Sequence, residues 1–182
     1  MTASAEQFIT PLSVSALSGE TTYTELFSLT DEAEMGHIRL ARSADLVLVM
    51  PATANLMARA AAGIADDLAT TILLATTAPV LMAPAMNPAM WTHPATSANL
   101  TILQKRGVHM IGPTEGDTAC GEIGSGRMSD PADIAAAAYQ LAVKRPRLLA
   151  GKTAIVTAGP TIEPIDSVRF IANHSSGKQG YA

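Results

Sequence analysis

The chain has 182 residues, of which 48% are hydrophobic and 4% aromatic, enough for a domain of ordinary size with an aliphatic core. A formal net charge of −4 without basic clusters argues against nucleic acid as a partner. One cysteine permits no internal disulfide, and no signal peptide is recognisable, so we expect a cytoplasmic protein. The uncharged run from Leu68 to Met86 is interrupted by prolines, which favours a buried helix and a buried strand over a membrane span.

The first part of the chain is predicted to be mostly helical up to a β-branched apolar strand. Thr10-Pro11 has the composition of a helix start, with an N-capping threonine and a proline at the first helical position, and Gly19 suits the helix end. The expected elements are a short helical segment over 3–9, a helix over 11–18, a polar loop over 20–34, a helix over 36–43, a strand over 45–50 and a helix over 56–62.

The same alternation continues through the middle of the chain and predicts an α/β protein with a parallel sheet. The expected elements are a helix capped by Asp66-Asp67 and running to 75, strands over 80–83 and 108–111, helices over 94–106 and 131–143, and a later strand over 153–159. The glycine-rich stretch 112–129 has no periodicity and is expected to be a mobile loop. We expect a three-layer Rossmann-like (flavodoxin-type) sheet whose N-terminal strand is missing, because no strand opens the chain.

The turn after the second buried strand is a candidate binding site. Pro84 and Pro88 stop the strand, and Asn87 between them offers two amide donors and one acceptor. Ligands of open parallel sheets bind at the carboxyl ends of the strands, where this turn is expected to lie. The alternative is a structural turn in which the asparagine binds its own backbone.

A similar turn, Pro51-Ala-Thr-Ala-Asn55, follows the preceding strand. Backbone amides at the start of the helix behind it would suit a phosphate, a carboxylate or the polar edge of a flat heterocycle. Two ordinary capped turns are the alternative interpretation.

Two further side chains could carry chemistry. Cys120 stands in a glycine-flanked stretch that could open and close as a lid, so we favour a reactive thiol over a structural one. His37 begins a short helix, where an unremarkable surface histidine is the alternative. The histidines and the single cysteine have no metal-ligand spacing, so no metal site is expected. Ser175-Ser-Gly-Lys178 is a weak match to a phosphate nest.

Taken in order, these segments resemble the homo-oligomeric flavin-containing cysteine decarboxylases, and among them the bifunctional coenzyme A biosynthesis flavoproteins. The resemblance rests on Met35-Gly-His-Ile38, Pro51-Ala-Thr-Ala-Asn55, Gly63-Ile-Ala-Asp-Asp-Leu68, Pro84-Ala-Met-Asn-Pro-Ala-Met-Trp91 and Ala119-Cys-Gly-Glu-Ile-Gly-Ser-Gly-Arg-Met128. Thr157-Ala-Gly-Pro-Thr161 and Asn173-His-Ser-Ser-Gly-Lys178 are similar to the start of the ligase domain that follows in such proteins.

The resemblance implies a flavoprotein (phosphopantothenoylcysteine decarboxylase) domain over 1–143, a linker over 144–150, and a truncated start of a phosphopantothenate–cysteine ligase domain over 151–182. It implies FMN-dependent, redox-neutral decarboxylation of 4'-phosphopantothenoylcysteine to 4'-phosphopantetheine. The cysteine end is oxidised to a thioaldehyde, carbon dioxide leaves, and the resulting enethiolate is reduced again. CTP and Mg2+ would serve a complete ligase domain, whose activity is not expected from this chain. Because the first strand and its turn are absent, weak FMN binding is expected.

The resemblance also assigns roles to individual residues. The catalytic residues would be His37 as base and Cys120 as proton donor. Asn87 would hold the substrate carboxylate, and the remaining substrate contacts would be Met90, Asp117, Thr118 and Ala119. The flavin contacts would be Thr53, Ala54, Asn55, Leu56 and Ala85, and Asn173 would belong to the ligase site. The implied assembly is a homo-oligomer, a trimer or dodecamer, in which His37 could serve a neighbouring subunit, with a small-molecule substrate and no membrane.

Two alternatives keep the same fold. A non-catalytic regulatory relative would bind a protein partner, but the joint presence of His37, Asn87 and Cys120 argues against it. A flavin prenyltransferase or a peptidyl-cysteine decarboxylase is the other alternative, and the ligase-like residues near the C-terminus argue against both.

Overall fold

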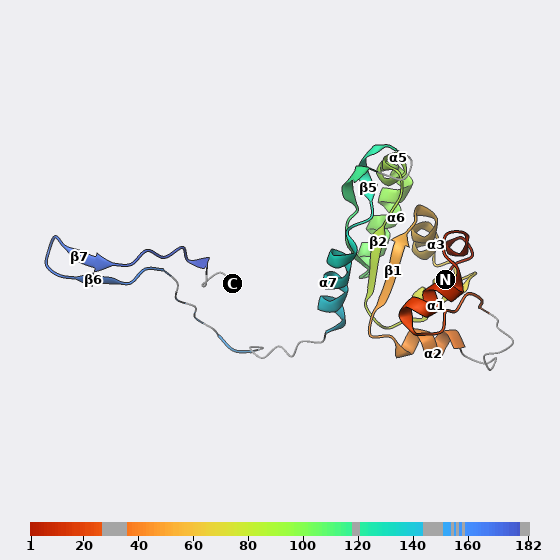
Figure 1. Cartoon of the computed structure of the whole chain (residues 1–182), viewed down its shortest axis with the longest axis horizontal. Coiled ribbons are helices and arrows are strands. Elements are labelled where there is room, and N and C mark those ends of the chain that lie inside the picture. The colour runs from red at the N-terminus through yellow and green to blue at the C-terminus, as the bar shows by residue number, and fades with distance from the viewer. Residues whose placement is uncertain are drawn as a thin grey trace. The chain divides into compact units, whose positions relative to one another are not determined.

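The computed structural model describes residues 1–26, 36–117, 121–143, 151–153, 155, 157 and 159–178. The chain divides into two units, Met1–Lys144 and Arg145–Ala182, which are described separately. Figure 1 traces the chain from the N-terminal helices to the C-terminal strands.

The first unit is organised around a parallel sheet in the order β1-β2-β3. Its strands are β1 (Val47–Ala52), β2 (Val80–Pro84) and β3 (His109–Met110). Val47, Leu48 and Val49 stand opposite Val80, Leu81 and Met82 in register. Leu81, Met82, Ala83 and Pro84 are all buried, as expected of a central strand covered on both faces. The predicted α/β class with a parallel sheet is therefore confirmed.

Helices cover the sheet in the layered arrangement expected for this class. The described helices of the first unit are η1 (Ala5–Gln7), α1 (Pro11–Ser18), α2 (Gly36–Ser43), α3 (Ala54–Ala62), α4 (Leu68–Ala75), α5 (Pro88–Thr92), α6 (Pro94–Lys105) and α7 (Pro131–Ala142). One core cluster joins Ala52 and Met82 of the sheet to Met57, Ala61 and Leu103 of α3 and α6. On the side away from α3, α7 lies beside β2 (Figure 1), and its Ile134 is buried.

Local end signals place several helices where the sequence predicts them. Thr10 adopts an extended conformation and its side chain accepts a hydrogen bond from the Ser13 amide, while Gly19 ends α1 with a φ of 72°. Asp67 closes a capping box with Thr70 at the start of α4. Because a cap satisfies amides that the helix leaves unpaired, these residues fix helix starts through local chemistry alone.

The stretch 112–129 differs from its prediction as a loop without regular structure. Its described residues contain β4 (Thr114–Asp117) and β5 (Ile123–Arg127), which form an antiparallel pair. Glycines at 116, 124 and 126 hide the alternation of side chains that normally identifies a strand. The prediction of an irregular loop was wrong for that reason.

The second unit contains a hairpin of β6 (Ile162–Pro164) and β7 (Phe170–Ala172), with antiparallel pairing. Arg169 forms an ion pair with Asp166 within the turn. The strand expected over 153–159 is not found among its described residues, and positions 154, 156 and 158 lie outside them. All six residues of β6 and β7 are exposed, so the hairpin has no core of its own.

Candidate functional site at the carboxyl edge of the sheet

Two turns meet at the carboxyl ends of β1 and β2. Ala52, the last residue of β1, stands opposite Pro84, the last residue of β2. The amide of Ala85 then donates a hydrogen bond to the carbonyl oxygen of Ala52 at 3.1 Å. This bond continues the pairing beyond the strands and holds the two turns together at one edge. The predicted proximity of the two turns is thus observed.

Thr53 starts α3 and leaves backbone donors at this edge. Its side chain accepts from the Leu56 amide at 3.3 Å, and its extended φ and ψ of −76° and 158° are those of an N-cap. Leu56 is 8% exposed and fixes the first turn of the helix against the core. Among the described residues, no acceptor is found for the amides of Ala54 and Asn55, so the helix start can donate to a ligand.

Asn87 starts the five-residue helix α5 on the neighbouring turn. Its Oδ1 accepts a hydrogen bond from the Met90 amide at 2.8 Å, and Pro88 occupies the first helical position. The alternative role of Asn87, a structural turn in which the side chain binds its own backbone, is therefore observed. It uses only the carbonyl end of the side chain, and within the described part of the chain the Nδ2 group has no acceptor. Asn87 can cap α5 and donate to a ligand at the same time.

The hairpin of β4 and β5 packs against this second turn. The amide of Met86 donates to the carbonyl oxygen of Gly126 at 3.0 Å. Figure 1 shows β5 beside α5 at one end of the first unit. This contact is not among the sequence-based predictions, although Gly124-Ser-Gly126 has the alternating small residues that allow two backbones to approach closely.

Several predicted substrate residues belong to the hairpin or its neighbour. Asp117 ends β4 opposite Ile123 and is exposed. Met90 on α5 is 47% exposed and could offer an apolar surface to a ligand. Thr118, Ala119 and Cys120 lie outside the described residues, so their predicted roles have no structural description here. Ala85, between β2 and Asn87, is half-buried.

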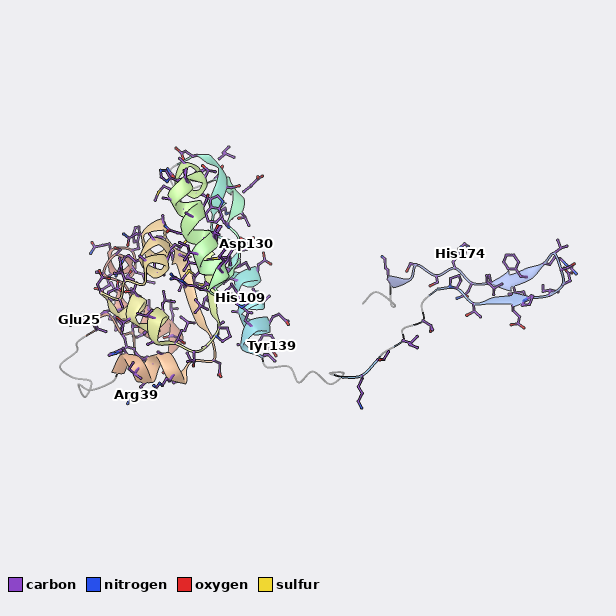
Figure 2. All side chains as sticks on the ribbon, turned by 180° about the vertical axis from the view of Figure 1, so that it is seen from behind. Glu25, Arg39, His109, Asp130, Tyr139 and His174 are labelled. Carbon is purple, nitrogen blue, oxygen red and sulfur yellow. The ribbon has the colours of Figure 1, made fainter. Side chains whose placement is uncertain are left out.

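His37 is not brought together with Asn87. It is the second residue of α2 and is half-buried. Figures 1 and 2 show α2 at the opposite end of the first unit from α5, with Arg39 marking α2 in Figure 2. His37 of one chain is therefore separated from the carboxyl edge of the same chain.

Asn173 lies in the second unit, just after β7. Its Oδ1 accepts a hydrogen bond from the Thr161 amide at 2.9 Å, and the residue is exposed. The side chain thus joins the two segments that flank the hairpin. Its predicted ligase role stays a prediction.

An ionic cluster that the sequence analysis did not recognise connects α3 to α4. The Arg59 guanidinium donates to both Asp66 and Asp67, with 2.9 Å to the Asp67 carboxylate, and to the Thr70 hydroxyl. Burial raises the pKa of Asp67, but hydrogen bonds from Thr70 and Arg59 outweigh it and hold that pKa below its ordinary value. The hydrogen bond with Asp67, followed by that with Asp66, raises the pKa of Arg59. The cluster fixes the far end of α3, whose start carries the free amides.

The first unit also contains a cavity of about 340 Å³ that is not at this edge. It lies at the amino end of β2, between α3, α4 and α6, and its walls are mainly aliphatic and threonine side chains. Arg106 at its rim donates to the carbonyl oxygen of Ala60. The donors described above do not line it, so we place the candidate site at the carboxyl edge and not in this cavity.

Among the residues that the structure describes, no cluster of three or more His, Cys, Asp or Glu side chains could hold a metal ion. Within the same residues, no helix is both long enough and apolar enough to cross a bilayer.

The fold and this edge define a class: a flavodoxin-like α/β protein with backbone and amide donors at the carboxyl ends of its parallel strands. Residues 1–142 match the flavoprotein family, and residues 149–182 match the DNA/pantothenate metabolism flavoprotein C-terminal domain. The chain belongs to the flavoprotein family.

Its sequence is similar to the coenzyme A biosynthesis bifunctional proteins CoaBC. It is 50% identical to that of Vibrio vulnificus over 182 residues and 51% identical to that of Escherichia coli over 184 residues. All of this chain is matched, but it spans only 45% of the length of either relative.

Solved structures agree with the fold. The FMN binding protein AtHal3 is 34% identical with a TM-score of 0.66, over 76% of this chain and 77% of that one. A PPC decarboxylase cysteine-to-serine mutant complexed with pantothenoylaminoethenethiol is 33% identical with a TM-score of 0.61, over 66% and 69%. The FMN-dependent cysteine decarboxylase SpaF is 34% identical with a TM-score of 0.63, over 79% and 78%.

Proposed function

We propose that the first unit is an FMN-dependent decarboxylase that converts 4'-phosphopantothenoylcysteine to 4'-phosphopantetheine in coenzyme A biosynthesis. The observation that carries the proposal is the Ala52–Ala85 hydrogen bond, which gathers the start of α3 and Asn87 at one edge. The similarity to CoaBC proteins and to a PPC decarboxylase structure supports the choice of substrate.

FMN fits the donors of the first turn. The amides of Ala54 and Asn55 and the positive end of the α3 dipole suit the polar edge of a flat heterocycle. Thr53, Leu56 and Ala85 would complete the contacts, with Leu56 anchored in the core. When bound, FMN would supply the oxidation of the substrate's cysteine end and the later return of the electrons.

The substrate would meet the second turn. Asn87 would donate from Nδ2 to the carboxylate that is lost, while its Oδ1 stays bound to the Met90 amide. His37 would remove a proton before carbon dioxide leaves, and Cys120 would donate a proton to the enethiolate afterwards. Met90, Asp117, Thr118 and Ala119 would line the remaining substrate surface.

The separation of α2 from α5 has a consequence for assembly (Figure 2). His37 can act at this edge only if it is supplied by another subunit, so we propose a homo-oligomer, a trimer or dodecamer, in the cytoplasm.

We also propose the boundaries 1–143 and 151–182 for the two domains, with 144–150 as the linker. Asn173 would then belong to a CTP- and Mg2+-dependent ligase site in the second domain.

A peptide carrying a C-terminal cysteine is the second candidate substrate, because SpaF, a cysteine decarboxylase, has a similar structure. The two candidates share the cysteine carboxylate that Asn87 would hold and differ in the rest of the molecule. The match of residues 149–182 to a pantothenate metabolism domain favours the first.

The test is direct. Purified protein is mixed with FMN and with either 4'-phosphopantothenoylcysteine or a peptide ending in cysteine. Visible absorption measures bound FMN, and mass spectrometry measures loss of carbon dioxide from each substrate. We expect decarboxylation of the pantothenoyl substrate and none of the peptide. Protein that binds FMN but acts only on the peptide, or on neither, would contradict the proposal.

A further inference from the structure

At two glycines of β5, the contact with the turn over 85–88 leaves too little room for a Cβ atom. A Cβ at Gly126 would lie 2.2 Å from the carbonyl oxygen of Met86, and one at Gly124 would lie 2.9 Å from Cγ of Pro88. The first clash is with backbone, which cannot rotate away as a flexible side chain can. Gly126 therefore permits a close approach of β5 to the backbone of the turn that alanine would block, and Gly124 leaves room for the Pro88 ring.

The same contact fastens the turn that presents Asn87. Met86 donates to the carbonyl oxygen of Gly126, while Ala85 donates to that of Ala52. Consecutive amides of the turn are thus bound to two different strands, one to β1 and one to β5. Since Oδ1 of Asn87 is in turn bound to the Met90 amide, the direction of its Nδ2 group follows from the backbone of residues 85–87.

We propose that Gly124 and Gly126 are positioning residues: they let β5 dock on the turn over 85–88 and so set the direction in which Asn87 presents its amide to an anionic group. The inference rests on the proposed function for the identity of that group, a substrate carboxylate. The docking itself can be tested without any ligand.

The first experiment measures amide hydrogen exchange in protein without ligand. In Gly126→Ala, the protection factors of the Met86 and Met90 amides should fall at least tenfold. The Met86 amide loses its acceptor, and the Met90 amide loses its oriented cap. Amides within β1 and β2 should keep theirs. Unchanged protection at Met86 and Met90 would overturn the proposal, and so would a uniform loss throughout the first unit.

The second experiment compares two ligands that differ in the carboxylate. In Gly126→Ala loaded with FMN, the KM for 4'-phosphopantothenoylcysteine should rise roughly 10- to 100-fold, the effect of losing one hydrogen bond to a charged group. The inhibition constant of 4'-phosphopantetheine, which lacks that carboxylate, should change less than about twofold. Equal weakening of both ligands would indicate a general structural role and overturn the positioning role.

Two further variants make the result independent of folding failure. Gly124→Ala meets a proline side chain and not a backbone carbonyl, so it should fold and show the same pattern with smaller changes. Ser125→Ala changes the residue between the glycines without adding a Cβ and should match the wild type. A protein that passes the exchange test but decarboxylates neither substrate would refute the proposed function while leaving the docking of β5 intact.

Discussion

The carbonyl oxygen of Ala52 accepts a hydrogen bond of 3.1 Å from the amide of Ala85, one residue beyond the end of β2. Ala52 precedes Thr53, the cap of α3, and Ala85 lies two residues before Asn87, the cap of α5. One backbone bond therefore links two helix starts that are separated by a complete βαβ connection. Both caps leave donors at the same edge, which makes this edge a candidate ligand site.

Asn87→Asp should separate the capping role from the binding role. Aspartate caps helices as well as asparagine, so thermal stability should change by less than about 0.5 kcal/mol. It would place a negative charge against the substrate carboxylate, so affinity should fall by more than the roughly 1.5–3 kcal/mol of one charged hydrogen bond. Steady-state kinetics and thermal denaturation measure the two effects, and normal kinetics would show that the residue is only a cap.

Thr53→Ala should weaken the start of α3. Loss of the hydrogen bond to the Leu56 amide should cost about 1 kcal/mol of unfolding free energy, whereas Thr53→Ser should retain it. If the Ala54 and Asn55 amides hold FMN, the Kd for FMN should also rise about fivefold in the alanine variant. Fluorescence titration of FMN tests this, and equal affinities in the two variants would remove the first turn from the cofactor site.

Asp67 should make stability depend on acidic pH. Folding lowers the pKa of this carboxyl group, so it stabilises the folded protein above its unfolded pKa of about 3.9 and loses that effect as the pH falls through the folded pKa. Asp67→Asn retains a cap but loses the charge, so its deficit relative to wild type should be constant between pH 7 and 5 and shrink below about pH 4. Chemical denaturation at several pH values measures it.

Two further variants serve as references for the unfolding free energy of Asp67→Asn. Asp67→Ala loses both the cap and the ion pair with Arg59 and should cost about 1–2 kcal/mol at pH 7. Asp66→Asn, whose carboxylate is more exposed, should cost less than about 1 kcal/mol. A deficit of Asp67→Asn that grows as the pH falls below 4 would contradict the assignment.

Cys120→Ser and His37→Ala should stop the proposed reaction at different stages. The last proton is needed only after carbon dioxide has left, so Cys120→Ser should release carbon dioxide in one turnover and accumulate the oxidised enethiol product. His37→Ala should release none, because its proton transfer comes first. Single-turnover mass spectrometry distinguishes the products. Normal formation of 4'-phosphopantetheine by Cys120→Ser would exclude the cysteine as the proton donor.

The β6–β7 hairpin should be weakly protected in this chain. Its six strand residues are exposed, and an isolated two-stranded hairpin is marginally stable in water. Amides of Ile162 and Ile171 should exchange at least a hundredfold faster than those of Leu81 and Met82 in the buried β2. Comparable protection in both places would mean that the hairpin is covered in solution.

Structural features that depend on a few neighbouring residues could be predicted directly from the sequence. The helix starts at Thr10-Pro11 and Asp67, the end of α1 at Gly19 and the alternation of strands and helices all follow from short-range capping and from hydrophobic pattern. The strand predicted over 45–50, with Pro51 opening the turn, is observed as β1 two residues later, because the structure continues the strand through Pro51 to Ala52. Strand ends depend on pairing, which local composition reports poorly.

Part of the candidate site could be predicted from the sequence, because it too depends on local signals. Thr53, Ala54, Asn55 and Asn87 could be placed at strand ends, since parallel strands have their carboxyl ends at one edge. The position of His37 away from this edge could not be predicted from the sequence. It depends on how α2 packs against the rest of the first unit.

Residue chemistry and spacing in the chain were enough to establish the α/β class, the cap residues and the two polar turns, because each depends on interactions within a few positions. Tertiary structure alone established the Ala52–Ala85 bond, the docking of β5 on the Asn87 turn and the Arg59–Asp67 ion pair. The first two join residues more than thirty positions apart, and the third depends on the angle between α3 and α4. Such contacts require backbones or charged groups to meet within about 3 Å. Periodicity reports which face of an element is apolar, but the distance between two elements arises only when their side chains pack.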